Sequence, residues 1–384
     1  MKSLRLTGIL LIAILTSSAM STGVWAKKGG KLGGGGGGDS APDLSCASHS
    51  SDFPTFAYVD TKLGRKSSSS DIYLSNADGD CAILVHSTST EANNLSFALN
   101  GNDVVIAWVE NFDTNYKSRS TLYRQDSIKV LRLSASNKVL SSLGFVETVL
   151  SSGDESLIYS GMDLSDDANF VVYIFDDPTS GSYIQSLREV DISSCSSSCS
   201  SSAIYTVSDS NEVITSVSYN SAANRVYFTG SFGPNASSPY AGFNLISFVE
   251  DQSGVFSSAV ILAAENSGYY GSDYSARGVI MDVDAGTADL GSGAVEAVSY
   301  RFYNVNTGRN EVHVIDADSC STSSTGDCLA NGESSVEVIV DDAELPSLSS
   351  GSLLFSSSVD DNLYRYDFVS GLLSAVGLGT QAAH

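Results

Sequence analysis

Short segments of alternating polar and apolar residues, each followed by a polar turn and a nearly continuous apolar run, recur along the chain. Alternation with a period of two is typical of β-strands, and Asn, Asp, Gly or Ser between two such runs predict a tight hairpin. We therefore predict a β-hairpin in each such stretch. The clearest are "LSFALNGNDVVIAWV" (Leu95–Val109), "GMDLSDDANFVVYIF" (Gly161–Phe175), "SVSYNSAANRVYFTG" (Ser216–Gly230) and "LPSLSSGSLLFSSSV" (Leu345–Val359).

A second pattern of strand, turn and strand follows these hairpins, as in "DIYLSNADGDCAILVHS" (Asp71–Ser87) and "NLYRYDFVSGLLSAVGLG" (Asn362–Gly379). Each repeated unit is therefore expected to hold four strands. The apolar runs that open a unit begin near six positions, which are Phe56, Val104, Val171, Val226, Val295 and Leu353.

The repeats predict an all-β fold, because no stretch has the periodicity of an amphipathic helix of three or more turns. Four-stranded antiparallel sheets that repeat around an axis leave only short sheet edges exposed. The sequence therefore predicts a six-bladed β-propeller of four-stranded antiparallel blades.

The N-terminal stretch "PDLSCASHSSDFPTFAYV" (Pro42–Val59) resembles the hairpin unit, and the last unit shows only three obvious strands. We therefore expect the ring to be closed by the N-terminal strand, as the outer strand of the last blade. The alternative is an N-terminal arm with no place in a blade.

Two of the quoted stretches resemble a known repeat. Asp71–Ser87 is similar to one half of the repeat of TolB-like propellers, and Gly161–Phe175 is similar to the other half. The chain lacks the Trp or Pro that commonly precedes the Asp-Gly turn in that family. The resemblance implies a periplasmic or secreted scaffold that often binds other proteins, and it carries over no catalytic residue.

The N-terminus has the features of an export signal. Lys2 and Arg5 precede a short apolar run and the small residues before Ala26, so residues 1–26 are predicted to be a signal peptide. The glycine-rich residues 27–41 are predicted to be a flexible tether, residues 42–380 the propeller and residues 381–384 a tail. No later stretch approaches the roughly 20 apolar residues of a membrane helix. We expect a periplasmic or secreted protein without a transmembrane segment after cleavage.

Charge limits the class of partner. The chain has 44 acidic and 20 basic residues and a formal net charge of -24. A nucleic acid would be repelled, because its phosphates must be neutralised by Lys and Arg. The acidic residues are spread along the chain, which is typical of a soluble surface.

Six cysteines in an exported chain predict disulfides. A zinc site is the alternative, but it requires converging Cys or His pairs, and the four histidines are scattered. The predicted pairs are Cys46 with Cys81, Cys195 with Cys199, and Cys320 with Cys328.

One acidic cluster is a candidate calcium site. Asp282, Asp284 and Asp289 stand close together in "DVDAGTAD", and carboxylate oxygens in loops are ligands that calcium prefers. The same residues are also typical of a tight turn. We expect no other cofactor.

Aromatic residues form the candidate binding face. Tyr and Arg dominate binding hot spots, and five of them stand in loop-like surroundings: Tyr269, Tyr270, Tyr274, Tyr303 and Arg309. The alternative is that these side chains pack on strands or anchor loops.

The sequence favours an exported, non-catalytic propeller scaffold that binds a protein or a glycan through loops at one face. No Gly-x-Ser-x-Gly elbow or other catalytic set is found, so no catalytic residue is assigned. The alternative is a propeller hydrolase or lyase that acts on carbohydrate or small esters with acidic residues in its funnel. Propellers host both classes, so the fold alone does not decide.

Overall fold

A computed structural model describes residues 53–63, 68–113, 124–134, 141–142, 147–151, 158–177, 184–195, 199–207, 212–232, 243–266, 278–290, 293–320, 336–357, 359–360, 362–379 and 381–383. All of them belong to one compact unit, Ala41–His384. The predicted signal peptide and tether lie outside the described residues. No helix within the described ranges is long and apolar enough to cross a membrane.

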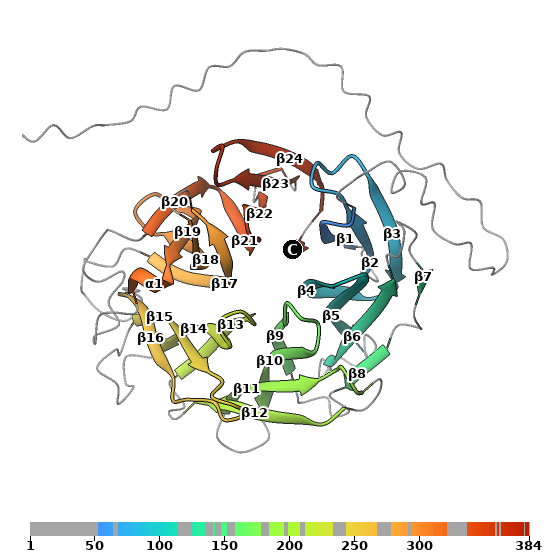
Figure 1. Cartoon of the computed structure of the whole chain (residues 1–384), viewed down its shortest axis with the longest axis horizontal. Coiled ribbons are helices and arrows are strands. Elements are labelled where there is room, and N and C mark those ends of the chain that lie inside the picture. Colours follow the sequence, from blue (N-terminus) through green and yellow to red (C-terminus); the bar gives the residue numbers. More distant parts are fainter. Residues whose placement is uncertain are drawn as a thin grey trace, which may run out of the picture. The chain divides into compact units, whose positions relative to one another are not determined.

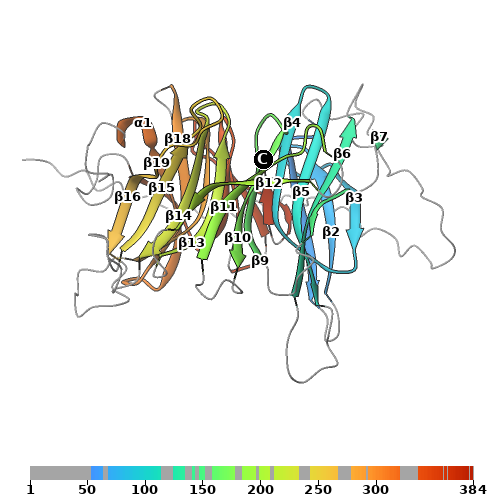
Figure 2. The same ribbon diagram turned by 90° about the horizontal axis from the view of Figure 1, so that it is seen from below.

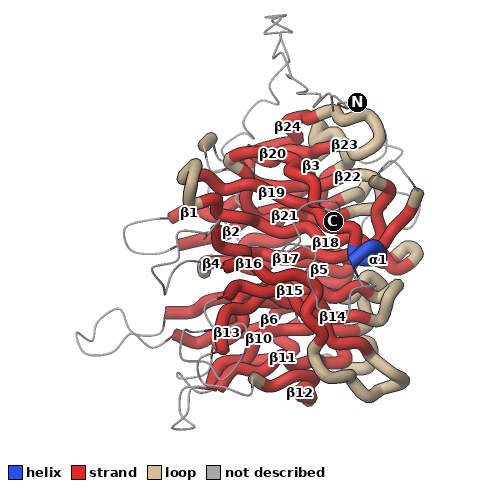
Figure 3. Tube along the Cα trace, turned by 90° about the vertical axis from the view of Figure 1, so that its left-hand side faces the viewer, coloured by secondary structure: helices blue, strands red, loops and turns tan. Residues whose placement is uncertain are grey.

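The described strands form six antiparallel sheets arranged around a central axis, and this confirms the predicted six-bladed propeller (Figure 1). Strands account for nearly all of the regular structure, as the tube view shows (Figure 3). The helix α1 (Ala317–Cys320) is a four-residue segment that follows the third strand of blade 5.

Blades 1 to 3 have the following strands, from the innermost outward. Blade 1 contains β25 (Gln381–Ala383), β1 (Phe56–Leu63), β2 (Ser68–Ser75) and β3 (Ala82–Thr88). Blade 2 contains β4 (Glu91–Asn100), β5 (Asp103–Asp113) and β6 (Arg124–Ser134), with β7 (Ser141–Ser142) and β8 (Glu147–Ser151) both paired to β6. Blade 3 contains β9 (Ile158–Leu164), β10 (Phe170–Asp177), β11 (Ile184–Asp191) and β12 (Ser201–Thr206).

Blades 4 to 6 repeat this order. Blade 4 contains β13 (Glu212–Asn220), β14 (Arg225–Phe232), β15 (Phe243–Glu250) and β16 (Val260–Asn266). Blade 5 contains β17 (Gly278–Asp289), β18 (Ala294–Asn304), β19 (Arg309–Asp316) and β20 (Val336–Asp341). Blade 6 contains β21 (Ala343–Leu348), β22 (Ser352–Ser357), β23 (Asn362–Asp367) and β24 (Leu373–Leu378).

The second strand of each blade is the predicted apolar run, and it is apolar because both of its faces are buried. In β10, Val171 and Tyr173 pack in the core shared with blade 2. Val172 and Ile174, which point the other way, pack in the core shared with blade 4. Successive side chains of a strand point to opposite faces, so a blade between two neighbours requires apolar residues at consecutive positions.

The strands run between two faces of the ring (Figure 2). The strand order repeats, so the connections between second and third strands lie together at one face, which we call the hairpin face. The connections between first and second strands lie at the other, which we call the turn face. The β18–β19 connection belongs to the hairpin face, because Asn304 pairs with Arg309 at its tip.

The strand that closes the ring differs from the predicted one. In the described residues it is the C-terminal β25, which pairs antiparallel with β1 through Ala57 and Ala383. Blade 6 already has four strands of its own, because β24 is its outer strand. Blade 1 therefore takes its innermost strand from residues 381–383, which were expected to be a tail. The N-terminal residues up to Asp52 lie outside the described residues.

The seam between the first and last blades is closely packed. Phe56 and Tyr58 of β1 share a buried core with Leu354 and Val376 of blade 6. Gly79 in the β2–β3 turn has a φ of +73°, and a Cβ placed there would lie 1.6 Å from the carbonyl oxygen of Val376. Only glycine therefore fits this turn against β24.

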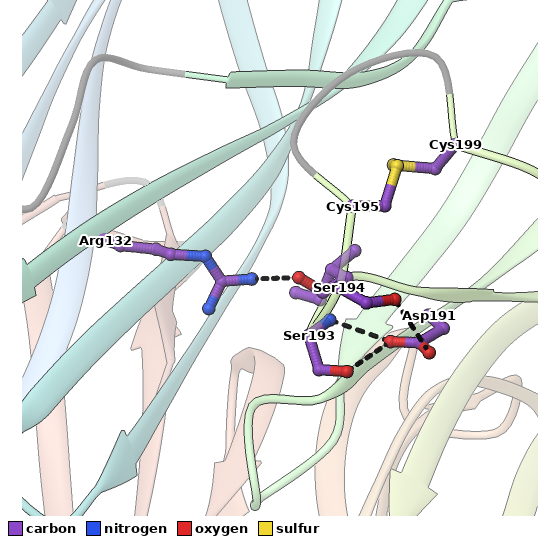
Figure 4. The surroundings of a disulfide bond; sticks show 7 residues. Arg132, Asp191, Ser193, Ser194, Cys195 and Cys199 are labelled. Carbon is purple, nitrogen blue, oxygen red and sulfur yellow. Dashed lines mark hydrogen bonds between the residues drawn. A yellow bond between two sulfur atoms is a disulfide. The ribbon is translucent and has the colours of Figure 1, made fainter.

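The disulfide between Cys195 and Cys199 lies between β11 and β12 (Figure 4). Cys199 packs in the core between blades 2 and 3. Nearby, the Arg132 guanidinium donates to the carbonyl oxygen of Ile192 over 2.6 Å and links blade 2 to this connection. Cys81 is disulfide-bonded, and its predicted partner Cys46 lies outside the described residues. Cys328 and the side chain of Cys320 also lie outside them.

Removal of residues 381–384 should destabilise the propeller by about 2 to 3 kcal/mol, because the ladder hydrogen bonds of β25 are lost at about 1 kcal/mol each. Urea unfolding of the truncated and full chains measures the difference. Removal of His384 alone is the control and should change little. Equal stabilities of the two truncated chains would contradict the role of β25.

Replacement of Cys195 and Cys199 together by serine should lower the free energy of unfolding by about 2 kcal/mol, since closing so short a loop restricts the unfolded chain only modestly. Chemical denaturation without reductant measures this loss. Under reducing conditions that open this disulfide, the difference between the two proteins should disappear. A difference that persists would assign the effect to packing of the sulfur atoms.

Candidate functional site

The innermost strands surround a central cavity of about 450 Å³. Its lining comes from β4, β9, β13, β17, β21 and β25 and from the turns that follow them. The acidic side chains in the lining are Asp163, Asp166, Asp282 and Asp284. No Lys, Arg or His is among the described residues that line the cavity.

Each innermost strand of blades 2 to 6 contains a β-bulge shortly before its cavity-lining end. Asn94, Asp282 and Leu345 occupy these bulges with positive φ angles of 51°, 46° and 50°. A bulge twists the strand and redirects its side chains. The residues that follow therefore come into hydrogen-bonding reach of the next blade.

Four side chains form a hydrogen-bonded belt around the axis, namely Ser96, Asp163, Ser218 and Asp284. They occupy corresponding positions in β4, β9, β13 and β17. Each accepts a hydrogen bond from a backbone N–H of the next blade. The donors are Leu164 to Ser96 (2.9 Å), Tyr219 to Asp163 (2.8 Å), Ala285 to Ser218 (3.0 Å), and Leu348 to Asp284.

The belt side chains also contact one another. The Ser96 hydroxyl donates to Asp163 Oδ1 over 2.7 Å. Ser218 Oγ lies 3.0 Å from Asp163 Oδ2 and 2.9 Å from Asp284 Oδ1. The belt is therefore continuous from blade 2 to the backbone of Leu348 in blade 6. Buried hydrogen bonds to ionised groups contribute about 1.5 to 3 kcal/mol each.

The two carboxyl groups of the belt share one electrostatic environment. Burial raises the pKa of Asp284 to about 8, and the nearby carboxylate of Asp163 is the second cause. Burial also raises the pKa of Asp163, against hydrogen bonds from Ser96, Tyr219 and Ser218 that favour its ionised form. Two carboxylates so close together do not both ionise easily.

This pair has the composition of a glycosidase site but not its geometry. Two carboxyls in different protonation states can act as acid and base on a substrate bound between them. Here the gap is filled by Ser218 Oγ. Backbone N–H groups of Tyr219 and Leu348 also occupy carboxyl oxygens. The arrangement therefore suits a structural link better than catalysis.

The structure separates the three predicted calcium ligands. Asp282 Oδ2 pairs with Arg301 Nε at 2.6 Å, Asp284 belongs to the belt, and Asp289 accepts from the backbone of Gly293 at 3.0 Å. Asp282 is the extra residue of the bulge between Met281 and Val283, so it has no register partner in β18. No group of three or more His, Cys, Asp or Glu that could hold a metal occurs among the described residues.

Two of the five predicted binding residues are described. Tyr303 and Arg309 flank the tip of the β18–β19 hairpin and are 38% and 56% exposed. Arg309 Nη1 lies 3.8 Å from Asp342 Oδ2, a long and exposed ion pair. Tyr269, Tyr270 and Tyr274 lie outside the described residues.

The belt residues Ser96, Asp163 and Ser218 were not predicted as a site. Each stands in a quoted hairpin two to four residues before the polar turn, and alignment of the repeats places them in one column with Asp284. This column is the signal in the sequence that could have identified the belt. Within any one hairpin these residues are ordinary polar positions of an alternating segment, and only Asp284 was considered, as a calcium ligand or a turn residue.

No family model and no curated protein matches the sequence. Solved structures do match, among them TolB, whose family the repeat resembles. TolB from Acinetobacter baumannii is 12% identical, with a TM-score of 0.49 over 86% of this chain and 67% of that chain. A chain of a nidogen/laminin complex is 11% identical, with a TM-score of 0.46 over 85% of this chain and 97% of that chain.

A puromycin-hydrolyzing peptidase from Mycobacterium tuberculosis is 9% identical, with a TM-score of 0.45 over 86% of this chain. This chain spans 55% of the peptidase. At such identities the likenesses concern the fold alone.

Replacement of Ser96 by alanine should destabilise the propeller by about 1 to 3 kcal/mol, because Leu164 N–H loses one of its two acceptors and Asp163 loses a donor inside the ring. Chemical denaturation measures the change. Ser350→Ala, at an exposed position of the cavity rim, is the matched control and should change stability by less than about 0.5 kcal/mol. Equal effects at the two positions would show that the belt contributes nothing.

Proposed function

We propose that this protein is an exported, non-catalytic propeller that binds a protein or glycan partner at the hairpin face. The observation that carries the proposal is the belt: the axial carboxyls Asp163 and Asp284 are engaged by Ser218 and by backbone N–H groups of neighbouring blades. Carboxyl groups that are hydrogen-bonded in this way hold neighbouring blades together. Export to the periplasm or the medium is supported by the N-terminal sequence.

The proposed contact surface centres on the tip of the β18–β19 hairpin. The tip is held in shape by Asn304, whose side-chain oxygen accepts from the backbone of Asn306 at 3.0 Å and whose carbonyl accepts from Gly308 at 2.8 Å. Tyr303 and Arg309 stand exposed on this rigid support. Exposed Tyr and Arg on a fixed backbone are well suited to binding, because little entropy is lost on association.

The first residues of β17 lie beside this hairpin. Gly278, the first residue of β17, pairs with Asn304, and Val279 pairs with Tyr303. The residues that carry Tyr269, Tyr270 and Tyr274 connect Asn266 to Gly278. These tyrosines lie outside the described residues, and their part in the proposed surface rests on the sequence alone.

A hydrolase or lyase is the weaker alternative. It is favoured by the proximity of Asp163 and Asp284 to the cavity. It is disfavoured because Ser218 occupies the space between them. An enzyme of this kind would lose its activity in Asp163→Asn, whereas a hairpin-face binder with an intact fold would not depend on that carboxylate for binding.

A photoreactive amino acid at position 303 tests the proposed surface, with Val255 as the matched control. Val255 is 70% exposed in the β15–β16 connection at the turn face. We expect a saturable crosslink to a periplasmic or extracellular partner from position 303 and none from position 255. Tyr303→Ala combined with Arg309→Ala should weaken the partner's affinity at least tenfold, about 1.4 kcal/mol.

Equal crosslinking from both positions, or unchanged affinity of the double variant, would contradict the proposed surface. Glycan arrays with the same variants decide between the two partner classes. Turnover of carbohydrate or ester substrates that disappears in Asp163→Asn, with the fold retained, would support the enzyme instead.

A further inference from the structure

The contacts of Ser218 favour a proton on a neighbouring carboxyl group. Its Oγ lies 3.0 Å from the Ala285 nitrogen, 3.0 Å from Asp163 Oδ2 and 2.9 Å from Asp284 Oδ1. A hydroxyl group has one hydrogen to donate and two lone pairs to accept. One lone pair accepts from Ala285, and the single hydrogen makes a full hydrogen bond to only one carboxyl oxygen. The contact with the other carboxyl oxygen is strongest when that oxygen donates to Ser218.

The remaining hydrogen bonds show which carboxyl carries the proton. Asp163 receives donors from Ser96 Oγ at 2.7 Å, Leu164 N at 2.8 Å and Tyr219 N at 2.8 Å. Asp284 receives, besides its contact with Ser218, the N–H of Leu348. Hydrogen bonds to a carboxylate favour its ionised form. Asp163 is therefore the ionised member and Asp284 the protonated one.

We propose that Asp163, Ser218 and Asp284 hold a single proton between them and that its loss at alkaline pH loosens the contact among blades 3, 4 and 5. In the protonated state Asp284 Oδ1–H donates to Ser218 Oγ, and Ser218 Oγ–H donates to Asp163 Oδ2. When the proton leaves, Ser218 still has one hydrogen for two carboxylates, and one of the two contacts becomes repulsive.

The charged groups around this bridge favour retention of the proton. Asp166 in the turn after β9 has a pKa raised to about 6, first by burial and then by Asp163, so it adds a negative charge above that pH and is a further cause of the raised pKa of Asp284. The acids from β17 and β21, Asp282 and Glu344, are both paired with Arg301. The strand β13 contributes Tyr219, whose pKa is raised to about 12, first by burial. β4 contributes the neutral Ser96 and β25 the neutral Gln381.

The raised pKa of Asp284 determines how the stability of the fold changes with pH. The pKa of Asp284 in the fold, about 8, is above the value near 3.9 of an unfolded aspartate. The folded state therefore holds the proton over a range in which the unfolded chain has lost it. Its contribution to stability is complete below pH about 4 and declines as pH rises toward 8.

Asp284→Asn provides the test, because its amide N–H can replace the carboxyl O–H as donor to Ser218 without titrating. Urea unfolding midpoints of both proteins are measured from pH 5 to pH 9. Titratable groups that do not interact with Asp284 cancel in the comparison. We expect the wild-type midpoint to fall relative to that of the variant as pH rises, with the largest gap at pH 9. Parallel curves would overturn the proposal.

Asp163→Asn is the matched variant that distinguishes the two carboxyls. Asparagine offers an N–H where the site needs an acceptor, so its unfolding midpoint should be lower than that of Asp284→Asn at every pH. The reverse order would overturn the assignment of the proton to Asp284.

Infrared spectroscopy of the wild type does not depend on a variant that folds. We expect the C=O stretching band of a protonated carboxylic acid at pH 7, above the pKa of about 6 of Asp166, and its loss in a titration centred near pH 8. Where Asp284→Asn folds, it should lack the band that titrates near pH 8. Absence of the band in the wild type at pH 7 would overturn the shared proton.

Discussion

The propeller depends on satisfying the backbone N–H groups that each innermost strand presents to the preceding blade. Apolar cores hold the outer parts of adjacent blades together, but near the axis the blades meet through polar atoms. A buried donor without an acceptor costs about 1 to 3 kcal/mol. The belt of Ser96, Asp163, Ser218 and Asp284 supplies one acceptor for each step from blade 2 to blade 6.

The two carboxyl groups of the belt, Asp163 and Asp284, have an electrostatic cost because they are buried close together. The proton that they share reduces this cost. A chain with net charge -24 has few cations available for the axis, and none lines the cavity among the described residues. An unpaired buried charge is expensive. A proton shared through Ser218 removes one of the two charges of Asp163 and Asp284, and it keeps every acceptor of the belt in use.

The sequence predicts the part of the fold that is local. Strand pairs such as β9–β10 are specified by alternation and a turn within about 15 residues, and the six second strands follow from consecutive apolar positions. The closing strand β25 was missed, because three residues, Gln381 to Ala383, carry no periodicity. The belt was missed because its contacts join residues 55 to 67 positions apart, such as Ser218 and Asp163 or Ser96 and Asp163. Nothing in a single hairpin indicates such a partner.

The residues that hold the ring together also differ in their contacts from the residues that we propose bind a partner. Residues at the axis are fixed by their neighbours on both sides, so a substitution at Asp163 alters the packing of several blades at once. The tip of the β18–β19 hairpin, by contrast, has its shape set by Asn304 and Gly308, and Tyr303 and Arg309 beside it are exposed. Binding residues are commonly carried by loops on a rigid framework. The acidic axis therefore links the blades of the ring, and the hairpin face is the part of the molecule where we propose that a partner binds.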